Sequence, residues 1–509
     1  MTETMTMPPA SLRQVPDHEV VIIGGGLSGI GVAIMLDRAG FDDYLLIEEG
    51  DGFGGAWHWN TYPGVGVDIP SFSYQFSFEQ ISGWSRVYAP GAELKAYAEH
   101  CVDKYDVRRR SRLLTCVDAT EYDADNDLWL VRLAGGEVIT SRFVVSATGV
   151  LTKPKKPEIP GVDEYAGTIM HTARWDHDAD LTGKRVAIIG TGASAVQIIP
   201  TVAGKVAQLT VFQRTPIWCL PKPDARLPLP LRLALGLVPG SKAAARLVSQ
   251  SYVEVTFPLA AHFHGIVPTA KLGEKLGHLH LRRSVHDPGI RRKLTPAYSL
   301  GCKRPSFSNS YLQSFNRENV LLETDPIERI TPSGVRTVNG TEHEVDVLIL
   351  ATGFTVFDKG NMPPFPISGV DGLDLEGFWS ENRFQAYHGV SVPGFPNLFS
   401  ILGPYGYNAS SYFNLIETQS QHIIRLLKAA RKRKATRVEV TERANAEYFA
   451  SVLGRRDNQV FFRGDCASAN SYYFDEHGDV PLRPSTTLGT MWDANHFRLR
   501  DYTFSNTQA

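Results

Sequence analysis

The chain has 509 residues, of which 43% are hydrophobic and 21% are charged. This composition predicts a globular protein of about two to four domains, and it excludes collagen, a coiled coil and wholesale disorder. The 52 Lys and Arg residues nearly balance the 54 Asp and Glu residues, so the formal net charge is only −2. No overall field draws such a protein to nucleic acid or to an anionic membrane, and we expect a small-molecule ligand.

The five cysteines are widely spaced and include no C-x-x-C or C-x-C pair. They are Cys101, Cys116, Cys219, Cys302 and Cys466. The odd number and the spacing argue against a disulfide framework and against a zinc or iron–sulfur site. We therefore predict reduced thiols, an inert Cys466, no metal site and a cytoplasmic location.

The first twenty residues lack the basic and then apolar order of a signal peptide, and we expect them to form a mobile leader. Two apolar stretches follow at residues 20–36 and 227–238. The first is rich in glycine and the second is interrupted by Pro228, Pro230 and Arg232. Neither is the run of about 20 apolar residues that a bilayer span needs, so no integral membrane association is predicted.

Two segments, residues 19–36 and 185–199, have the pattern of a strand, a glycine-rich loop and a helix. In each loop the first glycine permits a tight turn, and the second lets a pyrophosphate approach the backbone. The third small residue lets the helix pack on the strand. The expected dinucleotide-binding residues are Gly24, Gly26 and Gly29 in the first loop, and Gly190, Thr191, Gly192, Ser194, Ala195 and Gln197 in and after the second.

A charged residue occupies the same place in each unit, at the end of the second strand. Glu48 stands 24 residues after Gly24, and Arg214 stands 24 residues after Gly190. A carboxylate accepts hydrogen bonds from ribose hydroxyls, whereas Arg214 and the adjacent Thr215 offer donors to a 2′-phosphate. We therefore expect FAD in the first unit, and NADPH rather than NADH in the second.

Two apolar runs that end in Ala-Thr-Gly, at residues 144–149 and 348–353, are typical of strands that return under a bound dinucleotide. Proline-rich stretches at residues 153–160 and 393–396 indicate connections between domains. We predict an α/β fold with two Rossmann-like dinucleotide-binding domains, the second inserted in the first. The predicted boundaries are 1–150 and 385–509 for the FAD-binding domain, 151–220 and 300–384 for the NADP-binding domain, and 221–299 for a helical insert whose basic residues form a solvated face.

A flavin and a nicotinamide together suggest either a dithiol reductase or an oxygenase. A dithiol reductase needs a redox-active cysteine pair near the flavin, and the cysteine spacing offers none, so oxygen chemistry is favoured. Residues 54–68 read GGAWHWNTYPGVGVD and resemble a pattern of the Baeyer-Villiger monooxygenases at every specified position. Residues 165–176 resemble the fingerprint of the type I members of that family, with Tyr165 in place of Phe.

The fingerprint ends in Trp175-Asp176, whereas the related flavin-containing N- and S-monooxygenases usually end it in Tyr or Phe. The resemblance covers most of the chain, because residues 301–305 (GCKRP) follow in the family's order. Residues 465–473 resemble a C-terminal family segment only loosely, which leaves the substrate open. The resemblance implies FAD contacts for Gly55, Ala56, Trp57, Tyr74 and Val117, and a hinge or fingerprint role for Gly167, His171, Trp175 and Asp176.

The resemblance also implies that Arg304 is catalytic, that Asp68 orients it, and that Lys303 joins Arg214 at the 2′-phosphate. In the family, NADPH reduces FAD, and O2 then forms a C4a-peroxyflavin that attacks a ketone to give an ester or lactone. A fixed guanidinium suits that chemistry because it stabilises negative charge on the reacting oxygens. The expected partners are a ketone and O2, without nucleic acid, in a monomer or weak homo-oligomer.

Two alternatives remain open. One keeps the fold and changes the chemistry to N- or S-oxygenation, which the Trp175-Asp176 ending disfavours. The other is a non-enzymatic nucleotide-binding module such as a redox sensor, which the two complete loops and Arg304 disfavour.

Overall fold

The computed structural model describes residues 15–267, 269–357 and 360–506. Most of the predicted leader, residues 1–14, lies outside these residues. The described part of the leader is held in place: the Asp17 backbone N–H donates to Thr140 Oγ1 at 3.0 Å, and the first strand already begins at His18. Among the described residues, no helix combines the length and the apolar character needed to cross a membrane.

The first sheet has eight strands in the order β17-β4-β5-β6-β1-β2-β3, with β18 also pairing with β6. Its strands are β1 (His18–Ile23), β2 (Tyr44–Ile47), β3 (Ser111–Arg112), β4 (Val117–Asp123), β5 (Leu128–Leu133), β6 (Val138–Ser146), β17 (Ile367–Ser368) and β18 (Leu398–Ser400). The central strand β1 runs parallel to both β2 and β6. Its last four residues are buried, as expected for a parallel strand covered on both faces.

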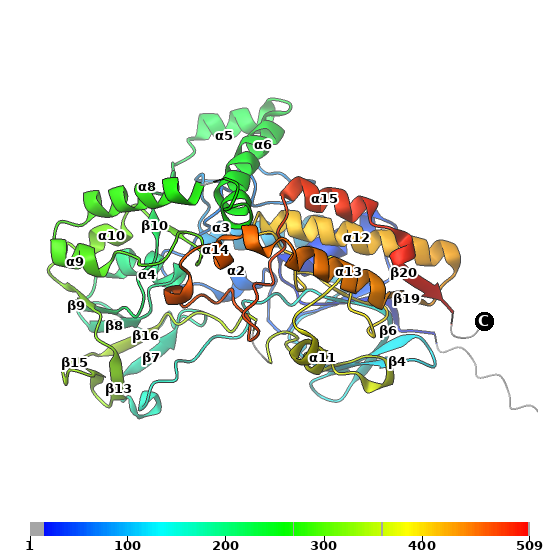
Figure 1. The fold of residues 1–509 in the computed structure, drawn as a ribbon, viewed down its shortest axis with the longest axis horizontal. Helices are drawn as coiled ribbons and strands as arrows, with labels where there is room; N and C mark the ends of the chain where they lie inside the picture. Colours follow the sequence, from blue (N-terminus) through cyan, green and yellow to red (C-terminus); the bar gives the residue numbers. More distant parts are fainter. Residues whose placement is uncertain (1–14, 268, 358–359, 507–509) are drawn as a thin grey trace, which may run out of the picture.

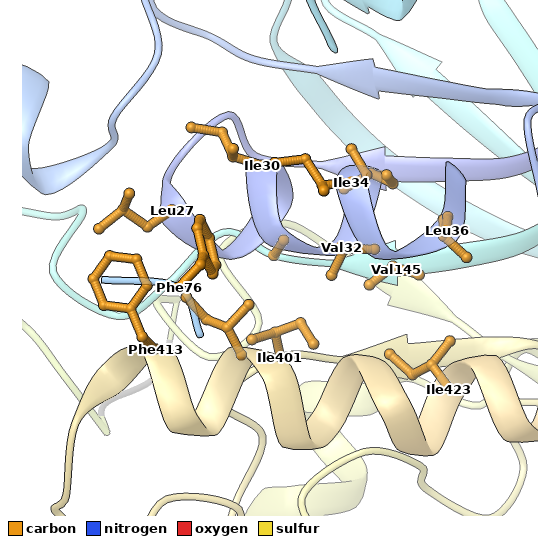
Figure 2. Packing of buried hydrophobic residues seen from close by; sticks show 14 of the residues in the cluster. Leu27, Ile30, Val32, Ile34, Leu36, Phe76, Val145, Ile401, Phe413 and Ile423 are labelled. Atoms are coloured by element: carbon orange, nitrogen blue, oxygen red, sulfur yellow. The ribbon is translucent and has the colours of Figure 1, made fainter. Parts of the chain in front are cut away.

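Helix α1 (Leu27–Arg38) follows the first glycine loop and packs between the sheet and the long helix α12 (Tyr412–Arg433). Figure 2 shows Phe413 of α12 close to Leu27 of α1, Ile423 of α12 on the side of Leu36, and Phe76 between the two helices. The close approach depends on Gly31, where an added Cβ would lie 2.5 Å from Ile416. The C-terminal part of the chain therefore supports the N-terminal glycine loop.

The second sheet is fully parallel, in the order β12-β9-β8-β16-β7. Its strands are β7 (Thr168–His171), β8 (Arg185–Ile189), β9 (Gln208–Phe212), β12 (Val320–Glu323) and β16 (Val347–Leu350). Helix α4 (Ala193–Val202) follows the second glycine loop. A small antiparallel sheet of β13 (Ile327–Thr331), β14 (Gly334–Thr337) and β15 (Glu342–Glu344) lies between β12 and β16 in the chain.

The second sheet is inserted between strands of the first, because the chain leaves after β6 and returns with β17 and β18. This confirms the predicted fold class. The return comes earlier than the predicted residue 385, since β17 pairs with β4 and the buried Val356, Trp379 and Phe384 pack in the core of the first sheet. The stretch before residue 385, which includes α11 (Leu375–Asn382), therefore lies on the first sheet.

Helices form the region between the second unit's β10 (Cys219–Leu220) and β11 (Ser306–Phe307). They are α5 (Leu229–Leu237), α6 (Ser241–Glu254), the π-helical turn η3 (Val255–Leu259), α7 (Ala260–His262), α8 (Thr269–Ser284) and α9 (Pro288–Lys293). In Figure 1 the α5–α6 hairpin projects from the upper edge of the molecule, where α8 and the late helix α15 (Thr487–His496) also lie.

The remaining helices are α2 (Ala56–Trp59), α3 (Gly91–Lys104), α10 (Tyr311–Ser314), α13 (Glu442–Leu453) and α14 (Val460–Arg463), and β19 (Arg437–Val440) pairs with β20 (Tyr502–Ser505) near the C-terminus.

One prediction about the cysteines is wrong. Cys302 and Cys466 form a disulfide across a sequence separation of 164 residues, with their Cα atoms 5.2 Å apart. Sequence spacing could not reveal this pair, because only the packing of α14 against the insert brings the two residues together. Cys101, Cys116 and Cys219 remain free thiols, and among the described residues no cluster of His, Cys, Asp and Glu suits a metal ion.

Candidate active site

The first glycine loop leaves no room for larger residues. Gly24 has φ +111°, and an added Cβ there would lie 2.7 Å from the carbonyl oxygen of Ala147. A Cβ on Gly29 would lie 1.9 Å from the carbonyl oxygen of Gly24, so only glycine lets α1 begin this close to the strand. Gly26 faces Gly55, where an added Cβ would be 2.9 Å from the Gly26 Cα. The loop and the 54–57 segment therefore meet backbone to backbone.

Glu48 lies at the end of β2, directly beside this loop, and is 6% exposed. Its carboxylate accepts hydrogen bonds from the backbone N–H groups of Gly25 at 2.5 Å and Gly50 at 2.8 Å. Burial raises the pKa of Glu48, although both hydrogen bonds act in the opposite direction. Each oxygen has a second lone pair, so the carboxylate can still accept from a ligand hydroxyl.

The second loop repeats this arrangement. Gly190 has φ +109°, and its added Cβ would lie 2.5 Å from the carbonyl oxygen of Ala351, the counterpart of Ala147. Ala195 takes the place of Gly29 and is completely buried. Gly192 differs from Gly26, because its added Cβ would meet no atom within 4 Å. The second loop thus has open space where a phosphate would approach the backbone.

Gln197 and Ser194 lie on α4 and face the first unit. The Tyr62 hydroxyl donates to Gln197 Oε1 at 3.0 Å, and Gln197 Nε2 donates to the Gly66 carbonyl at 2.9 Å. Burial raises the pKa of Tyr62 to about 12, against the effect of its hydrogen bond with Ser194. These contacts connect the helix of the second glycine loop to the segment that precedes Asp68.

Arg304 and Asp68 form a two-point ion pair. Arg304 Nε donates to Asp68 Oδ2 at 2.6 Å, and Nη2 donates to Oδ1 at 2.9 Å. The side chains are only 20% and 31% exposed. Burial opposes both charges, yet the attraction between them holds the pKa of Asp68 below its ordinary value and that of Arg304 well above it. Both groups are therefore ionised at neutral pH.

Lys303 and Arg214 lie close enough together for their positive charges to repel each other. Burial, followed by repulsion from Arg214, lowers the pKa of Lys303. No acidic side chain is among the groups that shift the pKa of Lys303. Thr215 is nearby, and its side chain accepts a hydrogen bond from Asn470 Nδ2 at 2.8 Å. Two neighbouring cations with a hydroxyl beside them form a site suited to an anion.

Trp57 and Tyr74 are neighbouring aromatic residues of the first unit. Trp57 Nε1 donates to the Tyr74 hydroxyl at 3.2 Å, and the two rings meet edge to face. Trp57 lies on α2, which starts at Ala56 directly after Gly55. Val117 lies at the start of β4 and packs in the same buried cluster as Ile23 of β1.

The 165–176 segment begins inside the second unit. Gly167 precedes β7, and its added Cβ would lie 2.8 Å from the Asp346 carbonyl oxygen. His171 ends β7; its Nδ1 accepts from the Ala173 N–H at 3.0 Å, while its buried Nε2 has no hydrogen-bond partner among the described residues. Burial lowers the pKa of His171, so the ring is neutral at pH 7. Trp175 packs against the core of the second unit.

The end of the same segment contacts the first unit. The Arg174 guanidinium lies over the Trp59 ring at 4.2 Å. His177, the residue directly after the segment, has its Nε2 2.8 Å from Thr61 Oγ1. Asp176 accepts a hydrogen bond from the Asp178 N–H within a local turn. The segment therefore bridges the two dinucleotide-binding units.

Sequence reasoning missed several residues around Arg304. The Phe257 ring lies 4.8 Å from the guanidinium carbon. Lys222 donates to the Val67 carbonyl at 3.1 Å, and burial lowers its pKa although Asp224 and Asp68 raise it. Tyr407 and Tyr473 also interact with Arg304. No local motif marks these residues, which reach the site from the insert and from the C-terminal region.

The comparisons with known proteins agree with this geometry. A family model described as "Pyridine nucleotide-disulphide oxidoreductase" matches residues 21–229, which contain both glycine loops. A Baeyer-Villiger monooxygenase of Pseudomonas aeruginosa is 37% identical over 90% of this chain and 86% of its own length. The chain belongs to the Baeyer-Villiger monooxygenases. A second such enzyme, from Streptomyces coelicolor, is 34% identical over 97% of this chain and 94% of its own length.

Solved structures of Baeyer-Villiger monooxygenases share the fold. The complex of OTEMO with FAD and NADP has a TM-score of 0.84 and 28% identity, and covers 97% of this chain and 100% of that protein. A closed structure of cyclohexanone monooxygenase has a TM-score of 0.84 and 28% identity, with 96% and 99% covered. The Cys302–Cys466 disulfide lies outside the residues that the oxidoreductase family model matches.

Proposed function

We propose that this Baeyer-Villiger monooxygenase uses FAD and NADPH to insert one oxygen atom of O2 beside a ketone carbonyl. The products are an ester or lactone, NADP⁺ and water. The second oxygen atom leaves in the water, whose two hydrogens come from the hydride of NADPH and one proton from solvent. The observation that carries the proposal is the ion pair between Arg304 and Asp68. Arg304 follows Lys303, the candidate ligand of the 2′-phosphate, and Asp68 ends the 54–68 segment on the FAD side.

The first unit fits FAD. Gly26 and Gly55 present bare backbone at the helix start, as a pyrophosphate requires. Glu48 keeps lone pairs for ribose hydroxyls. Trp57 and Tyr74 offer ring surface beside the loop. We propose that Gly24, Gly29, Ala56 and Val117 complete the contacts.

The second unit fits NADPH. The open space at Gly192 admits the pyrophosphate at the N-terminus of α4. Arg214, Thr215 and Lys303 would hold the 2′-phosphate, because two cations favour an anion that NADH lacks. Thr191, Ser194, Ala195 and Gln197 would shape the rest of the loop.

When bound, FAD reduced by NADPH supplies the electrons that activate O2. Two hydrogen bonds to Asp68 fix the orientation of the Arg304 guanidinium. The role of Arg304 is to stabilise the negative charge that develops on the reacting oxygens and on the ketone oxygen. Phe257 covers one face of the guanidinium and helps to exclude water from it.

The 165–176 segment would act as a hinge between the units. Gly167, His171 and Trp175 belong to the second unit, whereas Arg174 and His177 contact the first. A shift of the NADP-binding unit would therefore change the position of Asp176 and of the Trp59 region together.

We further propose a cytoplasmic enzyme, because NADPH is regenerated there, and a monomer or weak homo-oligomer. The loosely matching segment at residues 465–473 leaves the ketone class to experiment. Light scattering of the purified protein measures the mass of the assembly.

Product identification tests the function. The FAD-loaded protein is incubated in air with NADPH and a panel of linear, cyclic and aryl ketones plus one thioether, and the products are analysed by mass spectrometry. An ester or lactone with one added oxygen is expected. Sulfoxide without ketone products would instead establish an S-oxygenase, and NADPH oxidation with peroxide alone across the panel would contradict the ketone assignment.

A further inference from the structure

The α5–α6 hairpin exposes an apolar surface that no described part of the chain covers. Helix α5 contains no buried residue at all. We define the hairpin surface by its exposed side chains, which are Leu229, Leu231, Leu233, Leu237, Leu247 and Val248. Leu237 is 78% exposed and Val248 is 72% exposed. An apolar patch of this kind on a folded protein marks a site of interaction.

Neighbouring helices extend the same edge. In Figure 1, α8 and α15 lie on either side of the projecting hairpin. Both carry exposed apolar side chains, including Leu272 of α8, at 71% exposed, and Trp492 of α15, at 64% exposed. Exposed tryptophan and leucine side chains are typical of proteins that rest in the headgroup region of a bilayer.

The charge of this region differs from that of the rest of the chain. Residues 225–283 contain eight Lys and Arg but only two Glu, although the whole chain has a net charge of −2. No Asp or Glu occurs between residues 225 and 253, and the one acidic residue of the hairpin is Glu254 at the end of α6. The balanced total charge therefore conceals a basic, apolar edge on an otherwise acidic molecule.

The basic side chains flank the hairpin surface. Arg226 precedes α5 and is exposed, and Arg232 lies within it. Lys242, at the start of α6, donates to the Gln80 carbonyl at 3.0 Å, a contact that leaves its positive charge uncompensated. Positive charge beside apolar side chains complements an anionic lipid surface, where phosphate groups lie directly above the acyl chains.

We propose that the hairpin surface binds the surface of an anionic membrane, with α5 lying in the interface. A second copy of this chain fits less well, because a two-fold interface would place these cations against themselves. Nucleic acid would satisfy the cations but leave the leucines in water. A lipid surface satisfies both features. The hairpin rests on the membrane rather than spanning it, since α5 has 9 residues.

The position of the hairpin connects it to the candidate active site. Helix α6 continues directly into η3, which contains Phe257, and this ring lies 4.8 Å from the Arg304 guanidinium carbon. One continuous helical stretch thus leads from the membrane-facing tip to the catalytic arginine. Resting on the proposed function, this geometry favours apolar ketones that dissolve in the lipid as substrates.

Co-sedimentation with vesicles tests the binding. The full-length protein is mixed with phosphatidylcholine vesicles, and with vesicles in which about a third of the lipid is phosphatidylglycerol. Binding to the anionic vesicles is expected near 0.1 mM lipid, on the order of a single acyl anchor, and should weaken as salt is added. Binding to phosphatidylcholine alone is expected to be at least about tenfold weaker.

The double variant Leu237→Asp with Val248→Asp should lower the binding to anionic vesicles at least tenfold, because it places two carboxylates on the hairpin surface. Leu114→Asp is the matched control, since Leu114 is 76% exposed outside the insert and should leave binding unchanged. Absence of vesicle binding, or equal loss in the control, overturns the proposal. The proposal is also overturned if the protein is a dimer and the double variant is a monomer, because the hairpin surface would then bind a second copy of the chain.

Turnover of a water-soluble ketone without vesicles separates this proposal from the proposed function. The double variant should retain that turnover, since neither residue contacts the candidate site. If the unmodified protein binds vesicles but oxidises no ketone, the function fails and the membrane surface stands. If it oxidises ketones but ignores vesicles, only the membrane proposal fails.

Discussion

Arg304 and Asp68 are 236 residues apart in the chain, yet two hydrogen bonds of 2.6 Å and 2.9 Å join their side chains. Asp68 lies two residues after Gly66, whose carbonyl accepts a hydrogen bond from Gln197 on the helix of the second glycine loop. Arg304 directly follows Lys303, which is close enough to Arg214 for repulsion to lower its pKa. The ion pair is therefore the point at which the two dinucleotide units and the insert meet.

Replacing Arg304 by Ala should lower the rate of ester formation at least about 100-fold, because a preorganised charged donor is lost. FAD should remain bound, since Arg304 is outside the first glycine loop, which we propose as the FAD site. Arg304→Lys should be intermediate or inactive, because Lys keeps the charge but not the two-point pairing. Product yield and the flavin absorbance spectrum measure the two effects, and full oxygenation by the Ala variant would refute the catalytic role.

The Asp68 ion pair predicts a pH dependence of stability. Because the folded pKa of Asp68 is lowered, the contribution of the pair is fully present above the unfolded value of about 3.9 and is lost as pH falls through the folded value. Asp68→Asn should cost about 2 kcal/mol of unfolding free energy at pH 7. Denaturant unfolding at pH 7 and pH 3 measures this cost. An equal cost at both pH values would contradict the assignment.

If Lys303 holds the 2′-phosphate as proposed, Lys303→Ala should raise the KM for NADPH about tenfold and leave the KM for NADH nearly unchanged, because NADH lacks that phosphate. Arg214→Ala should act in the same way. Arg292→Ala, which removes an exposed cation from α9, is the control. Steady-state kinetics with both cofactors distinguish this role from a general loss of folding, which would affect the two cofactors alike.

Gly29→Ala should prevent FAD binding and lower the Tm, because its Cβ would meet the Gly24 carbonyl oxygen at 1.9 Å. Gly192→Ala is the matched change in the second unit. Its Cβ meets no atom within 4 Å, so the fold should tolerate it while NADPH binding weakens. Flavin content, Tm and NADPH titration report the difference, and equal effects of the two variants would argue against it.

Reduction of the Cys302–Cys466 disulfide should destabilise the protein by about 2–4 kcal/mol. Because Cys302 lies two residues before Arg304, reduction should also lower oxygenation per NADPH consumed. Cys466→Ser should reproduce both effects, whereas Cys116→Ser, at an exposed free thiol, should reproduce neither. Alkylation followed by intact-mass measurement establishes the pairing, and five reactive thiols in the oxidised, unfolded protein would disprove it.

The sequence by itself determined the two dinucleotide units. Strand, glycine loop and helix are set by neighbouring residues, and the positive φ values of Gly24 and Gly190 are local requirements that a one-dimensional pattern records. The equal distances from these glycines to Glu48 and Arg214 follow from the same repeated geometry. Residues 54–68 and 165–176 likewise identified the family because their spacing is local.

Only the tertiary structure decided how distant segments meet. The Cys302–Cys466 pair, the early return of β17 to the first sheet and the Phe257 ring beside Arg304 all join residues far apart in sequence. A charge total cannot show that the cations of residues 225–283 gather beside exposed leucines. Such contacts depend on how the two dinucleotide units and the insert pack against one another. That packing is set by the burial of apolar surface and by charge interactions between residues far apart in the chain, which local spacing does not encode.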